Sequence, residues 1–227
     1  MNRKFVQNQS IVKSELRKQF LAKRQTLKKS YVEQSSRIIV EKLFAEIKKL
    51  APTNVLVYLA FNNEVDTTEI INRLIASGKR VFLPKYDPAN TPGVKPERYP
   101  ENTPGVENAF EYVFAEFTNW QNLEEGPYGI LQPSLSSRHP ELARPERSRR
   151  VSGSIDVAII PGVAFDKKGT RLGYGKGVFD RLLAKSKDFR IGLAYEFQIV
   201  DTLPKENHDL VMDMVVTENR LIVNRKW

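Results

Sequence analysis

Residues 54–84 decide the fold, and they read NVLVYLAFNNEVDTTEIINRLIASGKRVFLP. Val55–Ala60 is an apolar run of strand length, and the polar residues after it are typical of a loop. A helix capped at one of residues 66–68 then runs to Gly78, where glycine permits a left-handed stop. Arg80–Pro84 predicts the next strand. A strand, a helix and a strand with short connections form a βαβ unit, so we expect the two strands to pair in parallel.

Further strands and helices are predicted on both sides of this unit. Ile155–Ile160 is a continuous apolar run, which suits a central parallel strand buried on both faces. The other strands expected are 109–117, 190–194 and an antiparallel closing pair, 213–217 with 221–223. Two amphipathic helices precede the unit, one from Ser10 or Ser14 to about Leu27 and one capped by Ser30 that ends near Leu50. This order predicts an α/β fold, a three-layer sandwich with a mostly parallel, Rossmann-like sheet and helices on both faces.

Two segments with biased composition interrupt this pattern. Residues 87–108 hold five prolines, and residues 134–153 are rich in arginine with almost no large apolar side chain. Neither composition supplies a packed core, so we expect both to be surface insertions in a single domain that spans residues 1–227.

Composition excludes several classes of protein. The 227 residues include no cysteine and only two histidines, which excludes disulfide scaffolds, thiolate zinc sites, cysteine nucleophiles and histidine-rich metal clusters. No apolar run reaches the roughly 20 residues of a membrane helix, and the polar start resembles no secretory signal, so we expect a cytoplasmic protein without membrane contact.

Positive charge is concentrated at the start of the chain. The net charge is +9, and the first 50 residues alone, with thirteen basic and four acidic side chains, account for all of it. Such a segment suits an anionic partner, which can be a nucleic acid or a polyphosphate or polyglutamate ligand.

A glycine-rich loop at residues 169–177 is the most informative motif. Gly173, Gly175 and Gly177 alternate, so consecutive backbone N–H groups can turn toward one centre and cradle a phosphate. A tight turn without a ligand is the alternative. Two cations in the segment, Arg171 and Lys176, favour an anion, whereas Asp180 would repel a phosphate unless Mg²⁺ bridges the two. Asp180 could instead complement the dipole of the helix that begins near Val178.

Lys13, Arg17 and Arg24 share one face of the first predicted helix. Three cations on one face repel one another, so a bound anion would relieve that repulsion. Spacing alone nevertheless favours a solvated basic face.

These segments resemble the 5-formyltetrahydrofolate cyclo-ligase family. Lys13-Ser-Glu-Leu-Arg17 is similar to the family's K-x-x-L-R element, and residues 171–180, RLGYGKGVFD, are similar to its R-L-G-x-G-x-G-Y-Y-D signature. Leu59-Ala-Phe-Asn-Asn-Glu64 and Tyr195-Glu-Phe-Gln198, followed by Pro204 and His208-Asp209, agree with further parts of the family pattern. The resemblance extends over essentially the whole chain.

The resemblance implies ATP- and Mg²⁺-dependent conversion of 5-formyltetrahydrofolate to 5,10-methenyltetrahydrofolate. It implies that Arg171 and Lys176 are catalytic and that Asp180 binds the metal. The implied ATP contacts are Lys13, Arg17, Arg171, Leu172, Gly173, Tyr174, Gly175, Lys176, Gly177 and Phe179. The implied folate contacts are Leu59, Glu64, Tyr174, Gly175, Lys176, Gly177 and Val178.

One departure from the signature concerns the folate site. Val178 stands where the family usually has tyrosine, so an aromatic or hydroxyl contact to folate is either missing or supplied elsewhere. The implied partner is a folate, with or without a polyglutamate tail (polyglutamylated), and the implied assembly is a monomer or a weak dimer. The alternatives are a nucleotide-binding regulatory module and a basic nucleic-acid-binding protein, but neither accounts for four motifs in the family's order.

Overall fold

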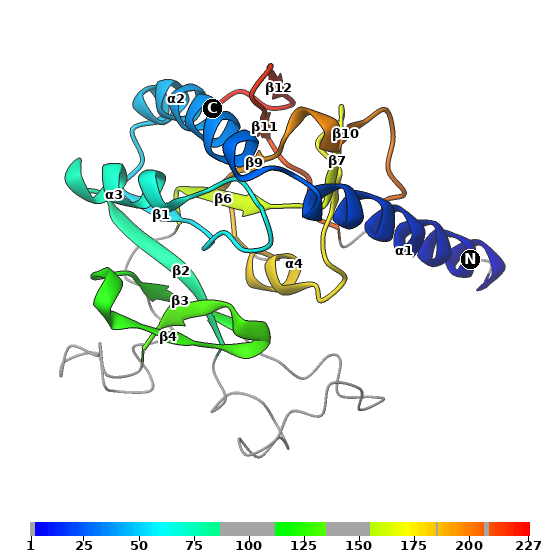
Figure 1. Ribbon diagram of the computed structural model, residues 1–227, viewed down its shortest axis with the longest axis horizontal. Helices are drawn as coiled ribbons and strands as arrows, with labels where there is room; N and C mark the ends of the chain where they lie inside the picture. The colour runs from blue at the N-terminus through cyan, green and yellow to red at the C-terminus, as the bar shows by residue number, and fades with distance from the viewer. Residues whose placement is uncertain (1–2, 87–111, 135–154, 185, 207–208) are drawn as a thin grey trace, which may run out of the picture.

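The computed structural model describes residues 3–86, 112–134, 155–184, 186–206 and 209–227 (Figure 1). Its main sheet has seven strands in the order β12-β11-β9-β6-β1-β2-β3. Their bounds are β1 Asn54–Leu56, β2 Arg80–Tyr86, β3 Tyr112–Glu116, β6 Val157–Pro161, β9 Phe189–Leu193, β11 Met214–Val216 and β12 Leu221–Val223. The five inner strands are parallel, and the edge strands β3 and β12 are antiparallel to their neighbours. The mostly parallel sheet expected from the sequence is confirmed.

Four α-helices accompany the sheet: α1 Arg3–Gln25, α2 Lys29–Leu50, α3 Thr68–Ala76 and α4 Val178–Leu182. Figure 1 shows α2 above the sheet and α4 below it, which gives the expected layers on both faces. Among the described residues, no helix is long and apolar enough to cross a membrane. Short 3-10 turns lie at Trp120–Asn122, Pro127–Gly129 and Glu196–Gln198.

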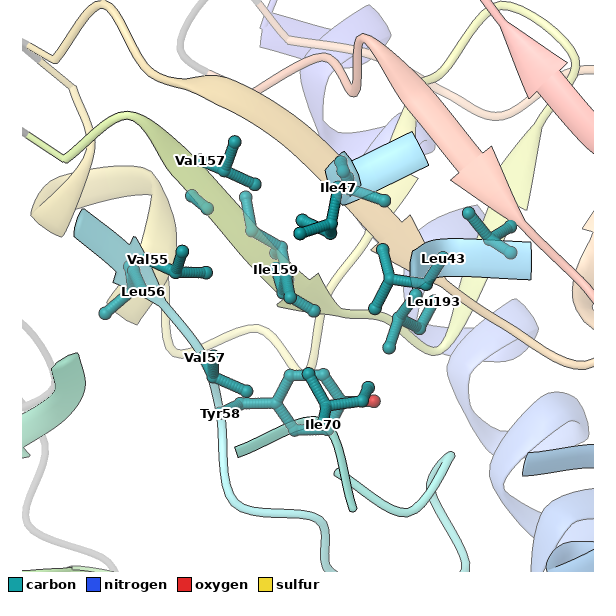
Figure 2. Close-up of a cluster of buried hydrophobic side chains, with 14 of the residues drawn as sticks. Leu43, Ile47, Val55, Leu56, Val57, Tyr58, Ile70, Val157, Ile159 and Leu193 are labelled. Carbon is teal, nitrogen blue, oxygen red and sulfur yellow. The ribbon is translucent and has the colours of Figure 1, made fainter. Parts of the chain in front are cut away.

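The hydrophobic core lies where α2 covers the central strands. Figure 2 shows Leu43 and Ile47 of α2 in one buried cluster with Val157 and Ile159 of β6, and all four side chains are at most 5% exposed. Every residue of β6 is buried. A strand buried on both faces explains why the sequence there is a continuous apolar run.

Several predicted boundaries are wrong. Neither Ser10 nor Ser14 caps the first helix, because helical hydrogen bonding already begins at Arg3. Ser30 lies inside α2, which begins at Lys29 without a side-chain cap. The first strand ends at Leu56 rather than Ala60, because the carbonyl of Tyr58 accepts the Thr67 hydroxyl instead of pairing in the sheet. For α3, Thr67 of the three candidates is at the cap position, but its side chain makes no cap hydrogen bond; instead the Thr68 N–H donates to Asp66 Oδ1 at 2.9 Å.

A second sheet was not expected. It has three strands in the order β10-β7-β8, with bounds β7 Ala164–Asp166, β8 Arg171–Leu172 and β10 Ile199–Val200. Part of the predicted glycine loop is therefore strand β8. The buried Asp166 carboxylate explains the turn, because its Oδ1 accepts the N–H groups of Lys168 and Thr170 and folds β8 back on β7.

A two-stranded sheet, β4 Leu123–Glu125 with β5 Leu131–Pro133, packs beside β2. The first predicted surface insertion, 87–108, lies wholly outside the described residues. The second, 134–153, also lies outside them except for Ser134.

Candidate functional site

A cavity of about 740 Å³ opens between α1, the segment after β1 and the glycine loop. It lies beyond the carboxyl end of β6, the side of a parallel sheet where ligands bind, because Pro161 is in its wall. Every site residue predicted from the sequence lines it, namely Lys13, Arg17, Leu59, Glu64 and all of residues 171–180. The structure thus brings together residues far apart in the chain, while the role of each remains a prediction.

The basic face of α1 points into this cavity rather than into solvent. Lys13 and Arg24 are only 7% and 1% exposed, so the solvated basic face that spacing favoured is wrong for both. Nζ of Lys13 lies 2.7 Å from Asp209 Oδ2 and 2.9 Å from Glu206 Oε1. Burial lowers the pKa of Lys13, but hydrogen bonds to these two carboxylates outweigh that effect and leave the pKa above its ordinary value. Arg17 Nε donates to the Gly173 carbonyl at 2.8 Å and joins α1 to the glycine loop.

Arg24 reaches the opposite end of the cavity. Its Nε donates to the Asn62 carbonyl at 3.0 Å, and a second guanidinium nitrogen donates to the Tyr174 hydroxyl. Its Nη1 lies 3.7 Å from Glu64 Oε1. Arg24 was not among the predicted site residues. The sequence could have indicated it, because Arg24 lies seven residues after Arg17 on the same face of the helix.

Glu64 is held in a tight turn after β1. Asn62 and Asn63 adopt left-handed φ values of 49° and 57°, a conformation that asparagine tolerates better than most residues. The turn buries the carboxylate, whose Oε1 accepts the Tyr174 hydroxyl at 2.6 Å and whose Oε2 accepts the Phe61 N–H at 3.2 Å. Burial raises the pKa of Glu64 to about 7, against opposing effects of Arg24 and the Tyr174 hydrogen bond. The carboxyl group therefore titrates near neutral pH.

Arg171 and Asp180 form a pair at the cationic end. Arg171 Nη2 lies 2.7 Å from Asp180 Oδ2, and Asp180 Oδ1 accepts the Leu210 N–H at 3.2 Å. Burial alone would raise the pKa of Asp180, but the Arg171 guanidinium outweighs it and keeps the pKa below its ordinary value. Asp180 is therefore an ionised carboxylate. Nε of Arg171 is buried and has no hydrogen-bond partner among the described residues.

The last two residues before Asp180 differ in exposure. Val178 is partly buried and packs against the core, whereas Phe179 is buried within it and lies with its ring centroid 6.0 Å from the Arg171 guanidinium carbon. Residues that were not among the predicted contacts also line the cavity: Tyr58, Phe61, Asn62, Glu206 and Asp209. Asp209 was visible as part of the His208-Asp209 pattern, although His208 itself lies outside the described residues.

Tyr195 and Gln198, from the C-terminal family pattern, make hydrogen bonds to backbone groups next to the cavity. The Tyr195 hydroxyl donates to the Glu64 carbonyl at 3.0 Å, and the Gln198 side-chain amide donates to the carbonyls of Gly162 and Val163. These bonds fix the backbone on both sides of the cavity.

The cavity thus has two chemically different ends. One holds Lys13, Arg17, Arg171 and Lys176 with the carboxylate of Asp180, a set that suits an anion and a divalent cation. The other holds the buried Glu64 carboxylate among aromatic and apolar walls that include Phe61, Leu83 and Ile130, a set that suits a planar ring with hydrogen-bond donors.

Comparisons with known proteins show which family the chain belongs to. A family model for the 5-formyltetrahydrofolate cyclo-ligase family matches residues 9–218. The 5-formyltetrahydrofolate cyclo-ligase of Escherichia coli K12 is 31% identical over 171 residues, which cover 74% of this chain and 79% of that protein. A probable 5-formyltetrahydrofolate cyclo-ligase of Caenorhabditis elegans is 30% identical over 194 residues, which cover 82% of this chain and 81% of that protein.

A solved structure of a related protein has the same fold. The NMR structure of Aquifex aeolicus 5,10-methenyltetrahydrofolate synthetase superposes with a TM-score of 0.70 at 28% identity, covering 95% of this chain and 94% of that one. Because the family model spans nearly the whole chain and the relatives match in sequence and fold, the chain belongs to the 5-formyltetrahydrofolate cyclo-ligase family, a family of ligases.

Proposed function

We propose that this protein converts 5-formyltetrahydrofolate to 5,10-methenyltetrahydrofolate, using Mg²⁺ and ATP and releasing ADP and phosphate. The observation that carries the proposal is the two-ended cavity, which places a cationic site and a buried carboxylate within one space of about 740 Å³. A reaction between a nucleoside triphosphate and a folate needs both ends.

The nucleotide phosphates fit the cationic end. Lys13 and Arg17 from α1, and Arg171 and Lys176 from the glycine loop, supply charge from two sides. Gly175 and Gly177 have left-handed φ values of 93° and 60°, and without side chains they leave the backbone open to the ligand. Phosphoryl transfer depends on positioning and charge neutralisation, which these residues would provide.

The donor set of the site fits Mg²⁺ bound together with ATP. No group of three or more potential metal-binding side chains occurs among the residues that the structure describes. Mg²⁺ is usually held by one or two carboxylates plus phosphate oxygens, so Asp180, with Asp209 as a second carboxylate in the cavity wall, matches this pattern. The ion would neutralise charge on the transferred phosphoryl group.

The folate reaction needs an activated formyl group, because a formyl amide is a poor electrophile. The formyl oxygen attacks the γ-phosphorus of ATP, and ADP leaves. N10 then attacks the formyl carbon, loses its proton, and phosphate departs with the former formyl oxygen as the ring closes. Glu64 would orient the pterin by accepting hydrogen bonds from its donor-rich edge, and Arg24 would hold Glu64 in place.

The positions of Lys13 and Arg24 speak against the nucleic-acid alternative. Both are buried in the cavity wall, so neither can track a phosphate backbone on the surface.

The test is to mix the purified protein with 5-formyltetrahydrofolate and Mg-ATP and follow the near-ultraviolet absorbance of the methenyl product, with samples lacking ATP or containing EDTA. We expect product only when both ATP and metal are present. Product without ATP, or no product at all, would contradict the proposal.

Asp180→Asn keeps the shape of the side chain but removes the charge that would bind Mg²⁺. We expect turnover to fall by at least about 100-fold. Asp201→Asn is the matched control, because Asp201 is 89% exposed and pairs only with the surface residue Lys167 among the ion pairs of the described chain. Equal turnover in the two variants would rule out the metal role of Asp180.

A further inference from the structure

The Tyr174 hydroxyl occupies the carboxylate that the proposed function assigns to folate. It donates to Glu64 Oε1 at 2.6 Å, and the Glu64 side chain is only 3% exposed. A carboxylate this enclosed has no open face at which the edge of a pterin ring could dock. One of the groups around Glu64 must therefore move when folate binds.

The groups around Glu64 differ in how far they can move. Arg24 is 1% exposed, and its guanidinium donates to the carbonyls of Asn62 and Gly162 as well as to the Tyr174 hydroxyl. The Phe61 N–H belongs to the same turn as Glu64 itself. Both are fixed parts of the wall.

Tyr174 is placed differently. It is half-buried, and it lies between Gly173 and Gly175 in the loop, with Gly175 at a left-handed φ of 93°. Its ring stacks on Phe61 with centroids 5.2 Å apart, a contact that a flat ligand could replace. Of the partners of Glu64, Tyr174 is the one on a glycine-flanked segment.

We infer that the Tyr174 hydroxyl occupies the position from which the pterin would donate to Glu64, so that folate binds by displacing this hydroxyl from Glu64. This inference rests on the proposed function, because it takes the folate to be the ligand of Glu64.

The inference predicts that a mutation in the binding site increases the affinity for folate instead of lowering it. Tyr174→Phe removes the competing donor while keeping the ring, so 5-formyltetrahydrofolate should bind about tenfold more tightly, the size expected for one hydrogen bond to a charged group. A residue that merely supports the cavity, or one that contacts bound folate through its hydroxyl, would give weaker binding on the same change.

The matched control is Tyr31→Phe. The Tyr31 hydroxyl donates to the Glu218 carboxylate at 2.6 Å, the same kind of bond at the same length, and neither residue lines the cavity. We expect this variant to bind folate as the unchanged protein does. Far-ultraviolet circular dichroism and urea unfolding of each variant check that the fold is retained.

The measurement is the Kd of 5-formyltetrahydrofolate without nucleotide, by isothermal titration calorimetry, for the unchanged protein, Tyr174→Phe, Tyr31→Phe, Glu64→Gln and the double variant. Tightening in Tyr174→Phe that shrinks to about threefold or less in the Glu64→Gln background supports the inference, because the hydroxyl then acts through Glu64. Unchanged or weaker binding in Tyr174→Phe overturns the inference alone. Absence of folate binding in every form overturns the proposed function and the inference with it.

Discussion

Glu64 combines burial, charge and hydrogen bonding in one side chain. Its carboxylate has donors at both oxygens and Arg24 at 3.7 Å, yet its pKa is raised to about 7 because burial outweighs them. The tyrosines that face it, Tyr58 and Tyr174, have raised pKa values as well, first through burial and then through the nearby Glu64 charge, so they remain neutral donors. Unlike these two tyrosines, Glu64 therefore changes its charge near neutral pH.

This raised pKa predicts how stability depends on pH. In the unfolded chain the group ionises near its ordinary value of 4.5, whereas in the folded protein it keeps its proton up to about pH 7. Its contribution to the free energy of unfolding is thus fully present below pH 4.5 and is lost as the pH rises to 7, by about 3 kcal/mol. Urea unfolding at pH 5 and pH 8 should show this loss in the unchanged protein, and Glu64→Gln should remove it.

Glu33→Gln is the control for this measurement. Glu33 is 64% exposed on α2 and pairs with Lys29, so its removal should leave the pH dependence unchanged. If Glu64→Gln and the unchanged protein lose the same stability between pH 5 and pH 8, the raised pKa of Glu64 is refuted.

The turn between β7 and β8 sets the position of Arg171. Gly169 in this turn has a φ of 80°, and a Cβ at this position would lie 2.3 Å from the Met212 carbonyl oxygen. Gly169→Ala therefore meets both backbone strain and a clash with backbone. We expect it to lower the free energy of unfolding by more than about 2 kcal/mol and to weaken nucleotide binding, because Arg171 follows two residues later.

Gly78→Ala separates these two costs. Gly78 has nearly the same φ, 74°, but a Cβ there would meet nothing within 4 Å, and the residue ends α3 away from the cavity. We expect a loss of only about 1 kcal/mol and unchanged nucleotide affinity. Thermal unfolding and nucleotide titration of both variants make the comparison, and equal losses of stability would show that the contact with Met212 is unimportant.

The elements differ in how much of them the sequence could predict. Val157–Pro161 and Thr68–Ala76 were predictable because strand burial and helical periodicity leave regular apolar patterns. β8 and β10 were not, because they have two residues each and depend on the turn that Asp166 forms. At the site, the burial of Arg24 was unpredictable for the same reason, since it depends on contacts with distant parts of the chain. Periodicity placed it on a basic face, but its burial depends on Tyr174, 150 residues away in the chain.

At the scale of the whole molecule, α1 is attached differently from the other long helix. Within residues 10–25 its buried side chains are Lys13 and Arg24, while Leu16, Phe20 and Leu21 are half-buried on a small cluster formed by Val163, Ala164, Leu172 and Leu203. By contrast, α2 buries Ile39, Leu43 and Ile47 in the main core. We expect α1 to open locally at a lower free energy than the sheet.

Nucleotide binding should reduce this difference between α1 and the sheet in the free energy of local opening. A nucleotide that engages Lys13 and Arg17 binds only when α1 is docked, so at 100 times its Kd it should slow amide exchange in α1 by about 100-fold. Hydrogen exchange with mass spectrometry, with and without a non-hydrolysable ATP analogue, measures the effect, and peptides from β6 serve as the internal reference. Identical exchange of α1 in both samples would show that α1 does not sense the nucleotide.

The ion pairs of Lys13 also bear on how the protein is made. Lys13 leaves the ribosome before both of its partners, because Glu206 and Asp209 lie 193 and 196 residues later in the chain. At about 5–20 residues per second, translation leaves the basic helix without these partners for roughly 10–40 seconds. A nascent chain that still lacks Glu206 and Asp209 therefore has an incomplete cavity wall, even when much of its sheet has already been translated.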